Sequence, residues 1–236
     1  MKTYKRIEKI CSTIDFALKY YGGEAVIADI GTDHGFIAES VSKLSGVKSV
    51  IATDISKKSI EKVKSLIKEK NLTNISTNVG DGLEAIDRAD IAVIAGIGGL
   101  EITKIIDGQN RNKSGKRKCN IFVLQPAQNI VELRNWAISR HYKILKDVTF
   151  EDNNQHYSVL VVDVSKFRIY RKSIYNLWLG RNCEEDAEEF NNYIKYLDGY
   201  LEFLDSVSKE RFKGDKILMQ KYKLRKLIKK KFLNKD

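Results

Sequence analysis

The sequence predicts an α/β fold, in which a mostly parallel sheet with helices on both faces is followed by a helical C-terminal region. Three observations support this prediction. Short β-branched runs alternate with helical patterns up to residue 141, two strand patterns then follow each other directly, and apolar stripes with helical spacing occupy the chain beyond residue 166. Alternating strands and helices imply right-handed βαβ crossovers and a parallel sheet that is buried on both faces.

The elements follow in a regular order. Residues 2–21 have apolar side chains at a helical period, and Gly22-Gly23 ends this helix. Five short runs predict the parallel strands, at residues 26–30, 50–54, 75–79, 91–95 and 121–125. Four helical patterns alternate with them, at residues 38–44, 56–70, 99–106 and 130–141.

A hairpin closes the sheet. Residues 142–150 and 157–164 are consecutive strand patterns joined by a polar loop at 151–156, which predicts an antiparallel pair. Five βα units followed by such a hairpin give seven strands. This arrangement matches the Rossmann-like sheet of class I methyltransferases better than a dehydrogenase domain.

Two apolar stripes predict a helical hairpin at the C-terminus, packed as an antiparallel coiled coil around Gly214-Asp215. The first stripe consists of Phe190, Tyr193, Ile194, Leu197, Tyr200, Leu201 and Leu204. The second consists of Ile217, Leu218, Leu224, Leu227 and Ile228. We therefore expect a sheet domain at 1–166 and a helical coiled-coil domain at 167–236, with no Pro- or Ser-rich linker between them.

Composition narrows the class of protein. The formal net charge is +11 and the pI about 9.4, which favours a nucleic-acid partner. An A+T-rich genome is the alternative explanation of the positive charge, because the 236 residues are rich in Lys, Ile and Asn and include one proline.

The three scattered cysteines predict neither disulfides nor a metal site. No apolar run is long enough for a membrane, and the N-terminus lacks a signal-peptide pattern, so we expect a cytoplasmic protein.

The first strand ends in the stretch ADIGTDHGF, residues 28–36, which bears on the ligand. Ligands of doubly wound sheets lie beyond the carboxyl ends of the strands. Asp29 and Asp33 flank Gly31 and would repel a pyrophosphate, but they suit a cationic ligand without phosphate, such as S-adenosylmethionine (SAM). The alternative is that Asp33 only caps the next helix and His34 packs in its first turn.

The next strands end in further acids and glycines. Asp54 is placed to accept hydrogen bonds from ribose hydroxyls, and Asp81 to reach an adenine amino group. Glycines after the fourth strand leave room for a flat group, and Gln125 offers an amide to a base edge. The predicted cofactor-binding set is Asp29, Gly31, Asp33, His34, Asp54, Ile55, Asp81, Gly82, Gly96 and Gly98.

Five motifs together resemble one family, the bacterial tRNA (adenine-22-N1)-methyltransferases. They are ADIGTDHGF, GDGL, IAGIGG, LQP with LRNW, and the tyrosine of QHYSVL. The similarity covers the chain to about residue 164, and the helical tail agrees in kind. Ala127 follows the proline of LQP, where the family commonly has Asn. Gln128 or Asn129 would then substitute for that Asn, or the pocket differs.

The resemblance implies methyl transfer from SAM to N1 of adenine 22 in the tRNA D-arm. Neutral adenine already holds a lone pair at N1, so alignment matters more than a strong base. Asp33 is the first candidate for stabilising the developing charge, and His34 and Gln125 are candidates for positioning the base. Tyr157 would stack on the extruded adenine, unless it is only a core residue of the hairpin.

Two basic segments predict the RNA surface. The loop before the fifth strand contributes Arg111, Lys113, Lys116, Arg117 and Lys118, and the C-terminal segment contributes Lys223, Arg225, Lys226, Lys229 and Lys230. A solvated helix face is the alternative interpretation of the second segment.

Two other functions stay open: SAM-dependent methylation of another RNA or a small molecule, and non-catalytic RNA binding. The sequence leaves the oligomeric state open.

Overall fold

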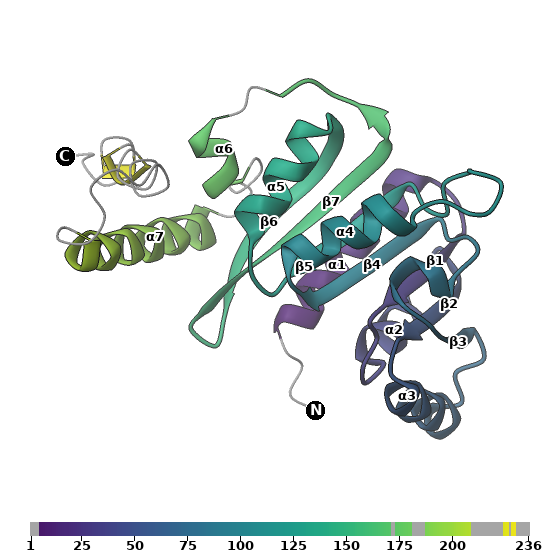
Figure 1. Cartoon of the computed structure of the whole chain (residues 1–236). Helices are drawn as coiled ribbons and strands as arrows, with labels where there is room; N and C mark the ends of the chain where they lie inside the picture. The colour runs from purple at the N-terminus through teal and green to yellow at the C-terminus, as the bar shows by residue number, and fades with distance from the viewer. Residues whose placement is uncertain (1–4, 171–172, 181–186, 209–223, 227, 230–236) are drawn as a thin grey trace.

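The computed structural model describes residues 5–170, 173–180, 187–208, 224–226 and 228–229. Seven strands form one sheet in the order β3-β2-β1-β4-β5-β7-β6 (Figure 1). The strands are β1 Ala25–Ile30, β2 Val47–Asp54, β3 Ile75–Val79, β4 Ile91–Ile97, β5 Ile121–Pro126, β6 Tyr142–Asp152 and β7 Gln155–Phe167. β1 to β5 are parallel and β7 is antiparallel to both β5 and β6, which confirms the predicted fold class.

Helices cover both faces of this sheet, as the alternating pattern predicts. They are α1 Lys5–Tyr21, α2 Phe36–Val41, α3 Lys57–Lys70, α4 Gly99–Gln109 and α5 Ile130–Ser139, with a 3₁₀ turn η1 at Gly82–Ala85. Alternate residues of β4 enter opposite cores: Ala92 and Ile94 pack with α4 and α5, whereas Ile91 and Val93 pack with α1, α2 and α3. Burial on both faces explains why the parallel strands have continuous apolar runs.

The turn between β6 and β7 is shorter than the loop that the sequence predicts. Pairing continues to Asp152 and Gln155, so the predicted six-residue loop at 151–156 is wrong and only Asn153-Asn154 form the turn. Both asparagines have left-handed backbone angles, with φ of 51° and 60°, which two-residue hairpin turns require. The longer strands extend the tip of the hairpin to the start of α1, where Asp152 Oδ2 accepts a hydrogen bond from the backbone N–H of Arg6 at 3.1 Å.

The C-terminal region lies at the β6 side of the sheet (Figure 1). It contains α6 Ile174–Trp178 and α7 Ala187–Ser208, and Leu224 and Ile228 are buried with the apolar stripe of α7. This burial agrees with the predicted packing of two helices. Ile217, Leu218, Leu227 and Gly214-Asp215 lie outside the described residues.

A buried arginine of the sheet domain joins it to the C-terminal region. The guanidinium of Arg134 on α5 lies 2.9 Å from Asp147 Oδ1 on β6, and both side chains are almost fully buried. The same guanidinium donates to the carbonyl oxygen of Trp178 at 2.8 Å. This bond attaches the end of α6 to the sheet domain. In the described ranges no helix is long and apolar enough to cross a membrane.

Candidate active site

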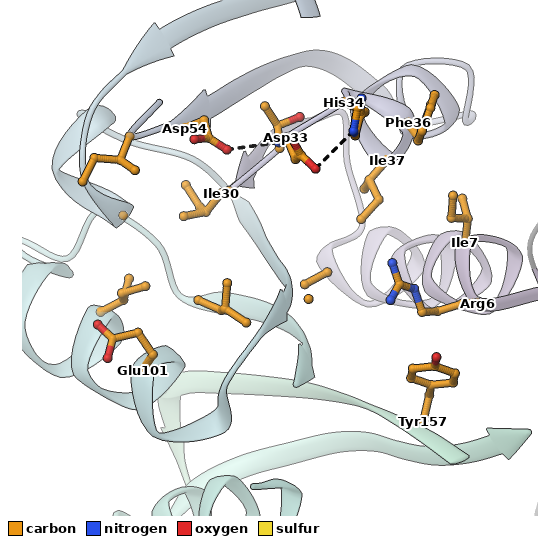
Figure 2. Close-up of a pocket in the computed structure, with 18 of the residues that line it drawn as sticks. Arg6, Ile7, Ile30, Asp33, His34, Phe36, Ile37, Asp54, Glu101 and Tyr157 are labelled. Atoms are coloured by element: carbon orange, nitrogen blue, oxygen red, sulfur yellow. Dashed lines mark hydrogen bonds and ion pairs between the residues drawn. The ribbon is translucent and has the colours of Figure 1, made fainter. Parts of the chain in front are cut away.

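A cavity of about 890 Å³ opens at the carboxyl ends of the parallel strands. At one end, here called the acidic end, Gly31, Asp33, Asp54 and Asp81 line it. At the other end, here called the hairpin end, it is lined by Arg6 of α1 and by Asp152, Asn153 and Tyr157 of the β6–β7 hairpin. Figure 2 shows Asp33 and Asp54 across the cavity from Arg6 and Tyr157.

The turn after β1 is built for close approach of a ligand. Gly31 has φ +76°, and no heavy atom lies within 4 Å of where its Cβ would be, so the space beside the backbone is open. The N–H groups of Gly31 and Thr32 both donate to the carbonyl oxygen of Thr53, at 2.8 and 2.9 Å. The ends of β1 and β2 are thereby fixed to each other.

Asp29 is buried beneath this turn and forms a hydrogen bond with it. It is 2% exposed and is not among the residues that line the cavity. Its Oδ2 accepts a hydrogen bond from Thr32 Oγ1 at 2.7 Å. Burial raises the pKa of the Asp29 carboxyl to about 6, although the hydrogen bonds from Thr32 and the Ala38 backbone act in the opposite direction. Direct contact of Asp29 with a ligand remains a prediction; the structure assigns it a hydrogen bond that orders the turn.

Asp54 and Asp33 are coupled through the backbone. Asp54 Oδ2 accepts from the N–H of Asp33 at 3.1 Å, and its Oδ1 accepts from the N–H of Ser56 at 2.8 Å. These bonds orient the Asp54 carboxylate and leave each oxygen a further lone pair. The Asp33 side chain is 62% exposed, lying 3.4 Å from His34 Nε2 and 3.6 Å from Lys62 Nζ.

The alternative interpretation of this turn as a simple cap does not fit. The N-cap residue of α2 is Gly35, and no side chain caps that helix. His34 instead stacks on Phe36, with ring centroids 5.5 Å apart, and its side chain is half exposed. Asp33 is therefore available to a ligand in the cavity.

Apolar and glycine positions shape the rest of the acidic end. Ile55, directly after β2, is 70% exposed and lines the cavity together with Gly82. Such an exposed aliphatic side chain beside acidic strand ends is suited to the face of a flat ring.

The glycines after β4 have different roles. Gly96 has φ +80° with open space beside it and lines the cavity. Gly98 is absent from the cavity lining, and a Cβ at this position would lie 3.6 Å from Gln128 Nε2. At Gly99 a Cβ would lie 2.4 Å from the carbonyl oxygen of Asn129, so that glycine permits close packing of α4. Only Gly96 of these three provides space in the cavity.

Gln125 is also outside the cavity lining. Its side chain is 1% exposed, and Nε2 donates to the carbonyl oxygen of Pro126 at 2.8 Å. Its Oε1 is buried and has no hydrogen-bond partner among the described residues. The predicted contact of Gln125 with an acceptor base stays a prediction.

The comparisons with known proteins agree with this architecture. The family described as "Methyltransferase domain" matches residues 4–160. The chain belongs to this family. It is 30% identical over 158 residues to the tRNA (adenine(22)-N(1))-methyltransferase of Bacillus subtilis (strain 168), a match that covers 66% of this chain and 65% of that enzyme. It is 31% identical over 164 residues to a putative tRNA methyltransferase of Mycoplasma genitalium, covering 68% of this chain and 71% of that protein.

Solved structures share the whole fold. The structure of M. capricolum TrmK with S-adenosyl-homocysteine has a TM-score of 0.78 and 20% identity, and the match covers 98% of this chain and 97% of that one. Streptococcus pneumoniae Sp1610, a putative tRNA (m1A22) methyltransferase in complex with SAM, has a TM-score of 0.76 and 20% identity, covering 95% and 98%. These matches confirm the fold of the methyltransferase, including a helical region after the sheet, and the relatives confirm the resemblance to the tRNA methyltransferase family.

The cavity lining contains three residues that the motif analysis missed, since none belongs to a recognised motif. Arg6 and Ile7 of α1 lie at the hairpin end, whereas Glu101 of α4 lies away from Arg6 and Tyr157 (Figure 2). α1 precedes the first strand, so its place beside the hairpin depends on the packing of the complete sheet. A basic residue at the start of an amphipathic helix is too common to reveal such a position.

The predicted basic residues of the methyltransferase fall into three groups. Arg111, Lys113, Lys116 and Arg117 lie in the loop between α4 and β5, where Arg111 donates to the carbonyl oxygen of Gly115 at 2.7 Å. Lys118 is buried and donates to the carbonyl oxygen of Leu83 at 2.7 Å, so we leave it out of the RNA surface.

The third group is C-terminal. Arg225 pairs with Asp198 at 3.2 Å and with Glu202 at 2.8 Å, which offsets its charge. Lys226 and Lys229 are exposed, whereas Lys223 and Lys230 lie outside the described residues.

Proposed function

We propose that this methyltransferase transfers the methyl group of SAM to N1 of adenine 22 in tRNA. The observation that carries the proposal is the cavity itself. Carboxylates stand at the ends of β1, β2 and β3 while the hairpin end presents an arginine over a tyrosine ring. SAM has an ammonium and a sulfonium but no phosphate, so it fits the acidic end, and an RNA nucleotide fits the hairpin end.

The chain's own residues can hold the cofactor. Asp54, oriented by two backbone N–H groups, would accept hydrogen bonds from the ribose hydroxyls. Asp81 and the exposed Ile55 would contact the adenine ring, and Gly31 and Gly96 leave space for the amino-acid part. Asp33 belongs to the same end of the cavity, and its exposed carboxylate would face the acceptor and stabilise positive charge. When bound, SAM supplies the electrophilic methyl group.

Little further chemistry is required of the side chains. Adenine N1 attacks with its own lone pair, so the enzyme must align nucleophile and methyl carbon and exclude water rather than remove a proton. The methylated adenine is a cation, which the nearby carboxylates favour electrostatically. His34 and Tyr157 line the cavity and are the candidates for positioning the base.

Binding of the tRNA would involve the surface around the cavity. Arg111, Lys113, Lys116 and Arg117 lie in a loop of the sheet domain, and Lys226 and Lys229 lie in the helical region. Lysines and arginines of this kind hold RNA through its phosphates and leave base choice to the pocket. The division into domains at 1–166 and 167–236 and the cytoplasmic location are part of this proposal.

The deciding experiment is incubation of bulk tRNA with labelled SAM, followed by nucleoside analysis and mapping of the modified position. We expect 1-methyladenosine at position 22, and a matched tRNA transcript with another base at position 22 to stay unlabelled. A label at a different position or in another nucleoside would contradict the proposed acceptor. No label at all, together with a melting temperature that SAM leaves unchanged, would contradict SAM-dependent methylation.

A further inference from the structure

Arg6 occupies a distinctive position in the cavity. Its guanidinium lies over the ring of Tyr157, 5.6 Å from the ring centroid, and the residue lines the cavity opposite the acidic end. Figure 2 shows its side chain extended from α1 toward the cavity, above Tyr157. A guanidinium held over an aromatic face keeps its N–H groups free at the ring's edge.

The acids around Arg6 are already engaged. Asp152 Oδ2 accepts the backbone N–H of Arg6, and Glu189 of α7 pairs with Lys5 and accepts the backbone N–H of Glu151 at 2.9 Å. Across the part of the chain that the structure describes, the Arg6 guanidinium forms no ion pair.

Three other arginines differ in this respect, since Arg134, Arg140 and Arg225 each pair with a carboxylate of a neighbouring element. Arg168 resembles Arg6 in its ring contact, but it lies on the exposed surface and does not line the cavity. Arg6 is instead held by its backbone and by a ring while its charge faces the cavity. This arrangement indicates an anionic ligand group at the hairpin end.

The chemistry of the two ligands decides which anion this is. SAM has no phosphate, and in the proposed binding mode its carboxylate would lie with its ammonium in the open space beside Gly31. An unchanged Kd for SAM in the Arg6 variants tests this placement. The acceptor nucleotide has phosphates on both sides of its ribose. A guanidinium placed on the adenine ring itself would oppose the cation that forms at N1, whereas one paired with a phosphate is neutralised. The planar fork of an arginine also suits two phosphate oxygens at once.

We propose that Arg6 binds a phosphate of the acceptor nucleotide whose base stacks on Tyr157, and so positions that nucleotide for methyl transfer. The inference rests on the proposed function, because it needs a polynucleotide acceptor. It goes beyond that function by assigning a positioning residue to the first helix. Arg6 and Tyr157 then form one nucleotide subsite from the two ends of the sheet domain.

The experiment compares Arg6→Gln, Arg6→Lys and the control Arg168→Gln. Arg168 makes the same type of contact, 5.7 Å over the ring of Tyr170, but it is exposed and does not line the cavity. Binding of tRNA to the full chain saturated with S-adenosyl-homocysteine is measured between 50 and roughly 200 mM salt, the range over which phosphate contacts are revealed. The Kd for SAM and the kcat and KM for tRNA are measured in parallel.

The phosphate contact predicts a specific set of results. Arg6→Gln reduces the slope of log K against log salt by about 0.7 to 0.9, the amount expected for one lost phosphate contact. It raises KM for tRNA about tenfold, the cost of about 1.4 kcal/mol in binding, and leaves the Kd for SAM unchanged. Arg6→Lys retains the slope because it retains the charge, and Arg168→Gln behaves as the wild type.

Other results overturn the inference. An unchanged slope in Arg6→Gln, or an equal loss in Arg168→Gln, would show that Arg6 contacts no phosphate. A parallel loss of SAM affinity in both Arg6 variants would show a structural role. If the wild type binds tRNA but yields no 1-methyladenosine at position 22, the proposed function fails while the salt slopes still decide the role of Arg6. A wild type that binds no tRNA would contradict both.

Discussion

The acidic end and the hairpin end of the cavity are built in different ways. The acidic end comes from three consecutive βα units, with Asp33, Asp54 and Asp81 at the strand ends. The hairpin end brings Arg6 of α1 together with Asp152 and Tyr157, which are about 150 residues further along the chain. Local topology alone places the first group, since the carboxyl ends of parallel strands share one edge, whereas the second group depends on the packing of α1 against the completed sheet.

The two ends also differ in charge. Asp33, Asp54 and Asp81 line one end, whereas the other end has one carboxylate, Asp152, beside the guanidinium of Arg6, which forms no ion pair among the described residues. A negatively charged end and an end with an accessible guanidinium can orient two ligands, a cationic donor and an anionic acceptor strand, without any contact that both ligands share. The following predictions test whether the ends act independently.

Replacing Asp54 should have the largest effect. Asp54→Ala removes the two charge-assisted hydrogen bonds that we propose to the ribose, worth together about 4 kcal/mol, or about a thousandfold in SAM affinity. Binding of tRNA should stay unchanged, because Asp54 belongs only to the acidic end. Calorimetric titration with SAM measures the first effect and a tRNA binding assay the second. Glu61→Ala on α3, which removes an exposed acid paired with Lys64, is the matched control. Equal losses of both ligands would mean that the ends are not independent.

The sequence could predict residues of the acidic end but not those of α1 at the hairpin end. The parallel units and the antiparallel hairpin follow from hydrophobic patterning, and the residues at the ends of β1, β2 and β3 follow from the strands that precede them. Arg6 could not be assigned in the same way, because its neighbour Tyr157 is remote in sequence and no periodic pattern links a helix terminus to a hairpin tip.

For a polar residue at the end of a strand, the sequence does not show whether its side chain enters the cavity. Asp29 and Gln125 end buried runs, as Asp54 does, yet both side chains are enclosed and outside the cavity lining. Lys118 belongs to a basic run but bonds to the carbonyl oxygen of Leu83. The sequence gives the chemical type of each residue. The face of the sheet on which its side chain lies changes with a shift of one residue along the strand, and an apolar or basic run does not determine that position.

Asp29 provides the second test, through stability. Its folded-state pKa of about 6 lies above the ordinary value of 3.8, so the folded protein binds the extra proton between these pH values. The carboxyl of Asp29 therefore favours the fold below pH 4 and costs about 3 kcal/mol of unfolding free energy once the pH exceeds 6. Asp29→Asn keeps an acceptor for Thr32 and removes this dependence.

The measurement is urea unfolding of both proteins between pH 4 and pH 7. We expect the variant to gain about 3 kcal/mol relative to the wild type over this range. The same substitution at the exposed Asp87 is the control for replacing a surface aspartate. A difference between Asp29→Asn and the wild type that does not change with pH would contradict a costly buried charge at Asp29. SAM affinity should fall less than in Asp54→Ala, because Asp29 acts through Thr32.

Tyr157 provides the smallest test, at the hairpin end. Stacking of a base on an aromatic ring is worth about 1 to 3 kcal/mol, so Tyr157→Leu should raise KM for tRNA about fivefold or more while SAM affinity stays constant. Tyr157→Phe keeps the ring, and it loses only a hydrogen bond from the hydroxyl to Gln155 Oε1 on the exposed surface, so it should match the wild type.

The competing explanation is that Tyr157 is a core residue, since its ring lies 5.9 Å from that of the buried Phe150. That role predicts a lower melting temperature for Tyr157→Leu, with KM changing no more than kcat. The stacking role predicts an unchanged melting temperature and a KM that changes more than kcat, because the ring is only partly buried and faces the cavity.

Combining Tyr157→Leu with Arg6→Gln tests whether the two residues hold the same nucleotide. Residues that hold one nucleotide together should give a double variant whose loss is smaller than the sum of the two single losses, whereas residues that act on separate ligands should give additive losses.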